Sequence, residues 1–90
     1  MENGTYRVDE EAGFFPVQTK EGYWVAIEEV LPSDLEAGEY LGVWTDENTN
    51  KTYYDRSILF LDLAQALNVA KLNNQIAIWD NKNEREIYVK

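Results

Sequence analysis

The 90-residue sequence predicts an α+β fold: a mostly antiparallel sheet of about 5–6 strands packed on one α-helix. Short stretches of alternating apolar and polar residues, typical of strands, recur along most of the chain. Residues 62–73 instead repeat their apolar side chains with the spacing of a helix. The chain is too short for two hydrophobic cores and has no internal repeat or linker, so we expect a single domain over residues 1–90.

The expected order of elements is β-β-β-β-α-β-β. Residues 1–12 hold an acidic cluster and few apolar side chains, and we interpret them as a flexible arm or a weak edge strand. Pro16 lacks an amide donor, which restricts the first firm strand to an edge of the sheet. A turn after it predicts a hairpin with the second strand. The six strands are expected at residues 14–18, 23–30, 39–45, 52–58, 75–79 and 84–89.

The helix has clear local signals. Asp62 is a suitable N-cap, and Gln65 stands three residues later, where a capping box places its second member. The apolar stripe is formed by Leu63, Ala66, Leu67 and Ala70. The helix connects the fourth strand to the fifth, and a right-handed crossover of this kind allows one parallel pair in the sheet.

Large apolar side chains allow two interpretations. Residues 58–61 are four apolar residues in succession, and we interpret them as a strand-to-helix junction buried on both sides. The alternative is an exposed patch that self-associates into a homodimer. We expect at least two of Trp24, Trp44 and Trp79 to lie in the core, because their rings are large enough to form much of it.

The chain contains neither histidine nor cysteine, which excludes catalysis by Ser–His or Cys–His pairs and metal sites built from these residues. Ser57 accordingly has no activating base near it in the sequence. Paired carboxylates remain possible acid–base groups, but so small a domain has little room for a substrate cleft. We expect a protein that is not an enzyme and has no cofactor.

The residues from Asp46 to Asn50 superficially match the start of a calcium loop. Lys51 occupies the sixth position, where glycine is required, and Ser57 the twelfth, where glutamate belongs. We therefore expect an ordinary hairpin turn without a metal, in which Asn50 adopts a left-handed backbone conformation.

The formal charge of −9 is unevenly distributed. Residues 1–50 contain 12 acidic and 2 basic residues, whereas residues 51–90 contain 5 acidic and 6 basic residues. Such a protein is repelled by nucleic acids and by anionic membranes, and it attracts a cationic partner. No apolar run is long enough for a membrane helix, and no secretory segment is recognisable, so we expect a cytoplasmic location.

We expect six of the acidic side chains to line one rim of the sheet if the second and third strands pair. They are Glu28, Glu29, Glu36, Glu39, Asp46 and Glu47. A row of carboxylates resembles the phosphates of nucleic acid, which carry one charge per about 1.7 Å of duplex axis. The rim would then occupy a basic groove of a partner protein. The alternative is a solvated acidic face that only keeps the protein soluble.

A second candidate surface is aromatic. Tyr40 and Trp44 are expected on one face of their strand, opposite Leu41 and Val43. Trp and Tyr are enriched at interfaces, so this face is a candidate site for a partner.

Residues 42–46, 51–57, 74–80 and 86–87 resemble small α+β proteins of phages and mobile elements, over about residues 22–89. The resemblance implies a short stand-alone protein without catalytic residues. Small acidic proteins from such sources include inhibitors of host defence, both anti-restriction and anti-CRISPR, which implies action in the cytoplasm of a host cell.

Three functional hypotheses follow. The first is an acidic, nucleic-acid-mimicking module that occludes a basic surface of a partner, such as a nucleic-acid-binding host protein. The second is a structural or assembly module that acts through a β-edge or through the aromatic face. The third is a small hydrolase that uses paired carboxylates.

Overall fold

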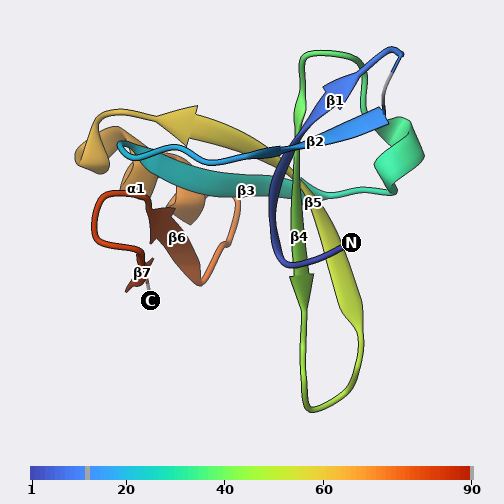
Figure 1. Ribbon diagram of the computed structural model, residues 1–90. Helices are drawn as coiled ribbons and strands as arrows, with labels where there is room; N and C mark the ends of the chain where they lie inside the picture. Colours follow the sequence, from blue (N-terminus) through green and yellow to red (C-terminus); the bar gives the residue numbers. More distant parts are fainter. Residues whose placement is uncertain (12, 90) are drawn as a thin grey trace. The chain divides into compact units, whose positions relative to one another are not determined.

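The computed structural model describes residues 1–11 and 13–89, and these residues form seven strands, a short 3-10 helix and one α-helix (Figure 1). The α+β class is confirmed, with seven strands where five or six were predicted. The strands are β1 (Gly4–Asp9), β2 (Gly13–Val17), β3 (Tyr23–Glu29), β4 (Tyr40–Thr45), β5 (Thr52–Phe60), β6 (Ala77–Asp80) and β7 (Arg85–Tyr88). The helices are η1 (Pro32–Asp34) and α1 (Leu63–Leu72).

Contacts within the chain divide it into two compact units. Unit 1 comprises Met1–Gln18 and Glu28–Ser57, and unit 2 comprises Thr19–Ile27 and Ile58–Lys90. Strands β3 and β5 each contribute residues to both units. Each unit has its own small cluster of four buried apolar residues, so the expectation that the chain is too short for two hydrophobic cores is wrong. The expectation of a single domain stays a prediction.

In unit 1 the strands are hydrogen-bonded in the order β2-β1-β4-β5. β1 is an inner strand, because Tyr6 is opposite Pro16 of β2 on one side and opposite Leu41 of β4 on the other. The predicted flexible arm or weak edge strand at residues 1–12 is therefore wrong for residues 4–9, and residue 12 lies outside the described residues. Two neighbours complete the hydrogen bonds of β1, so its few apolar side chains are sufficient to hold it.

β2 lies at the edge of this sheet, as Pro16 predicts. Its partner is β1, so the expected hairpin between residues 14–18 and 23–30 is wrong. Three residues separate β1 from β2 and five separate β2 from β3. The shorter connection favours the observed hairpin, because closing a shorter loop loses less entropy.

The core of unit 1 covers one face of its sheet. Leu41 and Val43 are buried there, as predicted, and Leu35 covers them from the loop that follows η1. The buried members of this core are Val8, Leu35, Leu41 and Val43, with Tyr6, Phe14, Val30 and Tyr54 packed against them.

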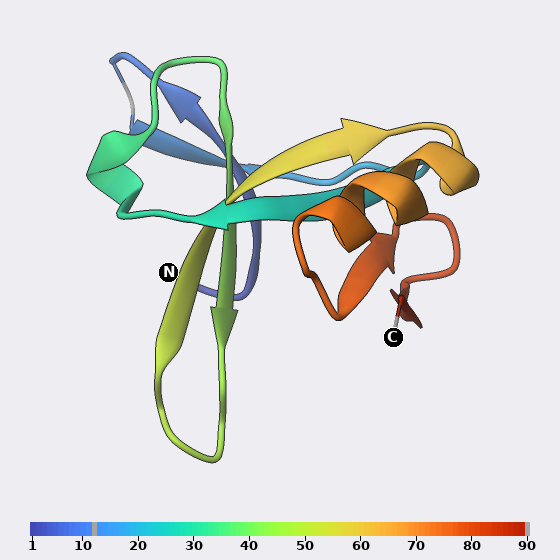
Figure 2. The ribbon, with the colours of Figure 1, turned by 180° about the vertical axis from the view of Figure 1, so that it is seen from behind.

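In unit 2, α1 packs on strands of an antiparallel sheet (Figure 2). Ala66 and Ala70 of the helix are fully buried with Val25 and Ile78. The expected parallel pair is absent from the described pairings, since β3 lies between β5 and β6 in the strand order and pairs with β6 in antiparallel fashion. The helix therefore connects two strands that are not neighbours.

Only one of the three tryptophans lies in the core, so the expectation of at least two is wrong. Trp24 is buried, at 7% exposure, whereas Trp44 is 51% exposed and Trp79 is also exposed. Strand alternation explains the difference, because Val43 and Ile78 point inward and leave their tryptophan neighbours to point outward.

The interpretation of residues 58–61 as a junction buried on both sides is also wrong. Ile58 and Leu61 are exposed, Leu61 to 76%. Phe60 packs against the core of unit 2 and is half-buried. Leu61 lies beyond the last residue of β5, in the connection to α1, so the strand pairing that would bury a junction ends before it.

Candidate functional site

Acidic residues are concentrated in unit 1. Its sequence contains 12 acidic and three basic residues, a formal charge of −9. Unit 2 contains five of each, a formal charge of zero. The whole net charge of the chain therefore lies in unit 1. A division of the chain at residue 50 gives nearly the same separation of net charge.

Backbone hydrogen bonds bring acidic segments together at one end of unit 1. The amide of Val8 donates to the carbonyl of Glu39 at 2.9 Å, and the amide of Gly38 donates to the carbonyl of Val8 at 2.8 Å. The turn after β1 therefore lies beside the segment that precedes β4, and the β1–β2 turn and η1 lie at the same end of the unit (Figures 1 and 2). We call this surface the acidic end: Asp9, Glu10, Glu11, Glu28, Glu29, Asp34, Glu36 and Glu39.

Arg56 joins two of these side chains. Its guanidinium pairs with the carboxylate of Glu28, and its Nε lies 2.9 Å from Oε2 of Glu39. The other oxygen of Glu39, Oε1, accepts a hydrogen bond of 2.8 Å from the backbone amide of Glu36. Glu39 is therefore largely occupied in holding the loop, whereas Glu36 is exposed and Glu28 remains half-exposed.

The expected rim of six carboxylates does not form as one surface. Glu28, Glu29, Glu36 and Glu39 belong to the acidic end, but Asp46 and Glu47 lie in the turn beyond the other end of β4. The six residues of β4 span about 20 Å at the rise of an extended strand. In Figure 1 the β4–β5 turn points away from η1. The side chain of Asp46 stabilises the β4–β5 turn, since its Oδ1 accepts a 2.9 Å hydrogen bond from the amide of Asn48.

Sequence reasoning missed four members of the acidic end: Asp9, Glu10, Glu11 and Asp34. Asp9 ends β1 and Glu10 and Glu11 follow it, and the antiparallel pairing of β1 with β4 brings them to this end. The alternation of Tyr6 and Val8 was the available signal, because it is the pattern of a half-buried strand.

The second candidate surface is the face of the unit 1 sheet opposite its core. Trp44 stacks on Tyr53 with ring centroids 5.4 Å apart and an interplanar angle of 28°. The guanidinium of Arg7 lies 5.9 Å from the centre of the Phe15 ring, and Nζ of Lys51 lies 4.7 Å from that of Tyr53. We call this surface the aromatic face: Arg7, Phe15, Tyr40, Gly42, Trp44, Tyr53 and Asp55. The predicted orientation of Trp44, away from buried Leu41 and Val43, is confirmed by its exposure.

Asp55 is the one member of the aromatic face with an acidic side chain. It is opposite Gly42 in the register of β4 and β5, and its side chain is half-buried. Burial raises the pKa of Asp55, and the nearby negative charge of Glu29 raises it further. Both causes disfavour the ionised form of Asp55, so the charged side chain destabilises the folded state.

Ser57 has a packing role beside Gly42. A Cβ atom on Gly42 would lie 2.7 Å from Oγ of Ser57, so a larger residue at this position would force the hydroxyl to move. Ser57 is buried within β5.

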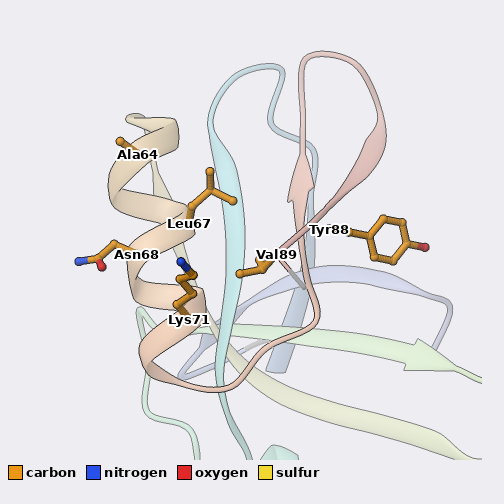
Figure 3. Close-up of a pocket in the computed structure, with 6 residues that line it drawn as sticks. All are labelled: Ala64, Leu67, Asn68, Lys71, Tyr88 and Val89. Atoms are coloured by element: carbon orange, nitrogen blue, oxygen red, sulfur yellow. The ribbon is translucent and has the colours of Figure 1, made fainter.

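Unit 2 contains a shallow cavity of about 420 Å³ beside α1 (Figure 3). It is lined by Ala64, Leu67, Asn68, Lys71, Tyr88 and Val89. Lys71 is its only charged lining residue, and the ring of Tyr88 points away from the helix (Figure 3). Without a carboxylate, this cavity offers no acid–base pair for hydrolysis.

The other perturbed carboxyl group is Asp80 of unit 2, which is 2% exposed. Hydrogen bonds from the side chain and backbone of Asn83 and from the amide of Lys82, together with nearby Arg85, lower the pKa of Asp80 despite its burial. These partners belong to the turn between β6 and β7, so Asp80 stabilises that turn. Among the described residues, no group of three or more acidic side chains is arranged to hold a metal ion.

Comparison with known proteins gives no relative. The sequence matches no protein-family model, and no curated protein or solved structure matches it. In the part of the chain that the structure describes, no helix has the length and apolar character needed to cross a membrane.

Proposed function

We propose that this chain is a non-enzymatic binding protein that covers a basic surface of a partner protein with the acidic end of unit 1. The observation that carries the proposal is the separation of charge between the units, −9 in unit 1 and zero in unit 2. Association with a basic surface would be accelerated by this field and would weaken as salt is added.

The arrangement of the acidic end supports an extended contact. Its carboxylates come from the β1–β2 turn, from the end of β3 and from the loop around η1. Hydrogen bonds fix these segments to one another through Val8, Gly38 and Glu39. Because the segments are held before binding, little ordering entropy is lost on association.

Basic surfaces of this kind are typical of proteins that bind nucleic acid. We therefore propose that the partner is a nucleic-acid-handling protein and that this chain competes with its nucleic acid. The resemblance to small phage and mobile-element proteins suggests the setting: inhibition of a host defence protein, by an anti-restriction or anti-CRISPR mechanism, in the host cytoplasm.

The test is a pull-down from host extract at low and at high salt, followed by binding measurements on each captured protein. Glu10→Lys/Glu11→Lys should abolish binding, because both side chains are exposed and lie outside the Arg56 contacts. Glu21→Lys/Glu84→Lys is the matched control, with the same charge change on exposed residues of unit 2. Binding that is insensitive to salt and survives the first pair of changes would contradict the proposal.

A second candidate is an assembly module, and the exposure of Trp44 beside Tyr53 favours it. In that case Trp44→Ala should abolish association with little dependence on salt. The version in which residues 58–61 form a homodimer predicts a concentration-dependent dimer in sedimentation, lost on Leu61→Ser. A monomer at all concentrations would contradict that version.

A further inference from the structure

Asp55 of the aromatic face and Glu29 of the acidic end lie at neighbouring positions of two adjacent strands. The amide of Val30 donates to the carbonyl of Tyr54 at 2.9 Å, so Glu29, the residue before Val30, is beside Asp55, the residue after Tyr54. The negative charge of Glu29 raises the pKa of Asp55. Among residues 1–11 and 13–89, the structure gives Asp55 no ion pair. Arg56, the next residue along β5, points to the opposite face of the sheet, where it pairs with Glu28 and Glu39. The pair of carboxylates therefore has unused capacity for a cation.

Aromatic rings flank the position opposite Asp55. Gly42 carries no side chain, and Tyr40 and Trp44 stand two residues before and after it on the same face of β4. Trp44 and Asp55 are thus diagonal neighbours across two paired strands, about 7–8 Å apart at their backbones. A planar cation lying on Trp44 would reach the carboxylate of Asp55.

We propose that the aromatic face binds an arginine side chain of the partner, whose guanidinium pairs with Asp55 and Glu29 and lies against Trp44. The proposal rests on the proposed function, since it concerns the same basic partner. Arginine fits better than lysine, because its flat guanidinium stacks on aromatic rings and forms paired hydrogen bonds with a carboxylate.

The chain already uses this face to hold its own cations. Arg7 lies over Phe15 and Lys51 lies over Tyr53, both on the aromatic face. Trp44 has no such cation over it in the described residues, and it is the most exposed of the three tryptophans. A second copy of this chain is a poor occupant, since two units of charge −9 repel one another.

The test uses a short peptide of alternating arginine and glycine, and a peptide with citrulline, a neutral residue of the same shape, in place of arginine. Nuclear magnetic resonance would follow the three tryptophan indole N–H signals and the backbone amides during each titration. The arginine peptide should shift the Trp44 indole and the Asp55 amide saturably, and the citrulline peptide should not. Asp55→Asn should weaken binding about tenfold, the usual scale for a lost charge-assisted contact.

Glu21→Gln removes the same charge from an exposed position of unit 2, outside both surfaces, and should change the affinity less than twofold. Trp44→Ala is a second test variant, because it removes the ring against which the guanidinium would lie. The side chain is exposed, so its loss does not disturb the core. Shifts confined to residues 9–11 and 36 would overturn the arginine site and leave the proposed function standing. No saturable shift at either surface would also overturn it, while the pull-down with Glu10→Lys/Glu11→Lys decides the proposed function separately.

Discussion

Asp55 shows how a single residue can favour binding at the expense of stability. Its carboxylate is half-buried beside Glu29, and both features disfavour its ionised form. A residue whose only task was to stabilise β5 would be uncharged at this position. The cost is explained if a cation from a partner neutralises the site.

We therefore expect Asp55→Asn to raise the melting temperature at neutral pH. The folded-state pKa of Asp55 is raised above the ordinary 3.8, so its cost is fully present above the raised pKa. That cost decreases as pH falls, and it vanishes below 3.8, where the carboxyl group is protonated in both folded and unfolded chains. Thermal melts of the two proteins between neutral and acid pH should accordingly converge. A variant less stable than the wild type at neutral pH would contradict this account.

Gly42 of β4 and Ser57 of β5 are in close contact across two paired strands. Gly42→Ala would place Cβ 2.7 Å from Oγ of Ser57, and we expect a loss of about 1–3 kcal/mol in the free energy of unfolding. Ser57→Ala removes the obstructing oxygen. In denaturant unfolding, the double variant Gly42→Ala/Ser57→Ala should therefore recover most of the free energy of unfolding that Gly42→Ala loses. If the losses of the two single variants simply add in the double variant, the contact is not the cause.

At the scale of elements, the sequence predicts the helix better than the strand pairing. The N-cap Asp62 and the buried positions Ala66 and Ala70 agree with the structure, whereas Leu63, expected in the same stripe, is exposed near the start of the helix. The left-handed conformation predicted for Asn50 is also confirmed. Each of these signals is local, so a few neighbouring residues contain it completely.

Pairing partners are not local, and here only the hairpin across residues 46–50 is confirmed, by the pairing of β4 with β5. β1 was overlooked because its own residues include only two large apolar side chains facing the core, Tyr6 and Val8. What makes it a strand is the presence of β2 and β4 on its two sides. The position of the acidic end depends on the same pairing, so it could not be located from residue spacing alone.

The cap of α1 gives a prediction for this element. Oδ1 of Asp62 accepts a 2.9 Å hydrogen bond from the amide of Ala64. Asp62→Ala should therefore lower the free energy of unfolding by about 0.5–2 kcal/mol. Asp62→Asn keeps a capping oxygen and should lose less. Chemical denaturation of the three proteins measures the difference, and equal losses in both variants would show that the cap contributes nothing.

At the scale of the whole molecule, composition predicts the excess of acid, but only the fold shows how it is distributed. The six residues expected along one rim lie at two ends of β4, and the last residue of β1 and the turn after it supply three further acids to one of these ends. The charge of unit 1 is opposed by only three basic residues, of which Arg56 is engaged with Glu28 and Glu39. Self-repulsion within this unit is therefore a stability cost of the whole chain.

Salt should relieve this cost. Raising sodium chloride from about 0.02 M to about 0.3 M shortens the screening length to less than the width of the unit, so we expect the melting temperature to rise. Glu10→Gln/Glu11→Gln/Glu47→Gln removes three exposed charges from unit 1 and should reduce the slope of that rise. Glu21→Gln/Glu84→Gln/Glu86→Gln, which removes three exposed charges from the neutral unit 2, is the matched control and should leave the slope nearly unchanged. A melting temperature that falls with salt in the wild type would mean that ion pairs such as Arg56 with Glu39 outweigh the repulsion, and equal slopes in the two variants would mean that the repulsion is not centred in unit 1.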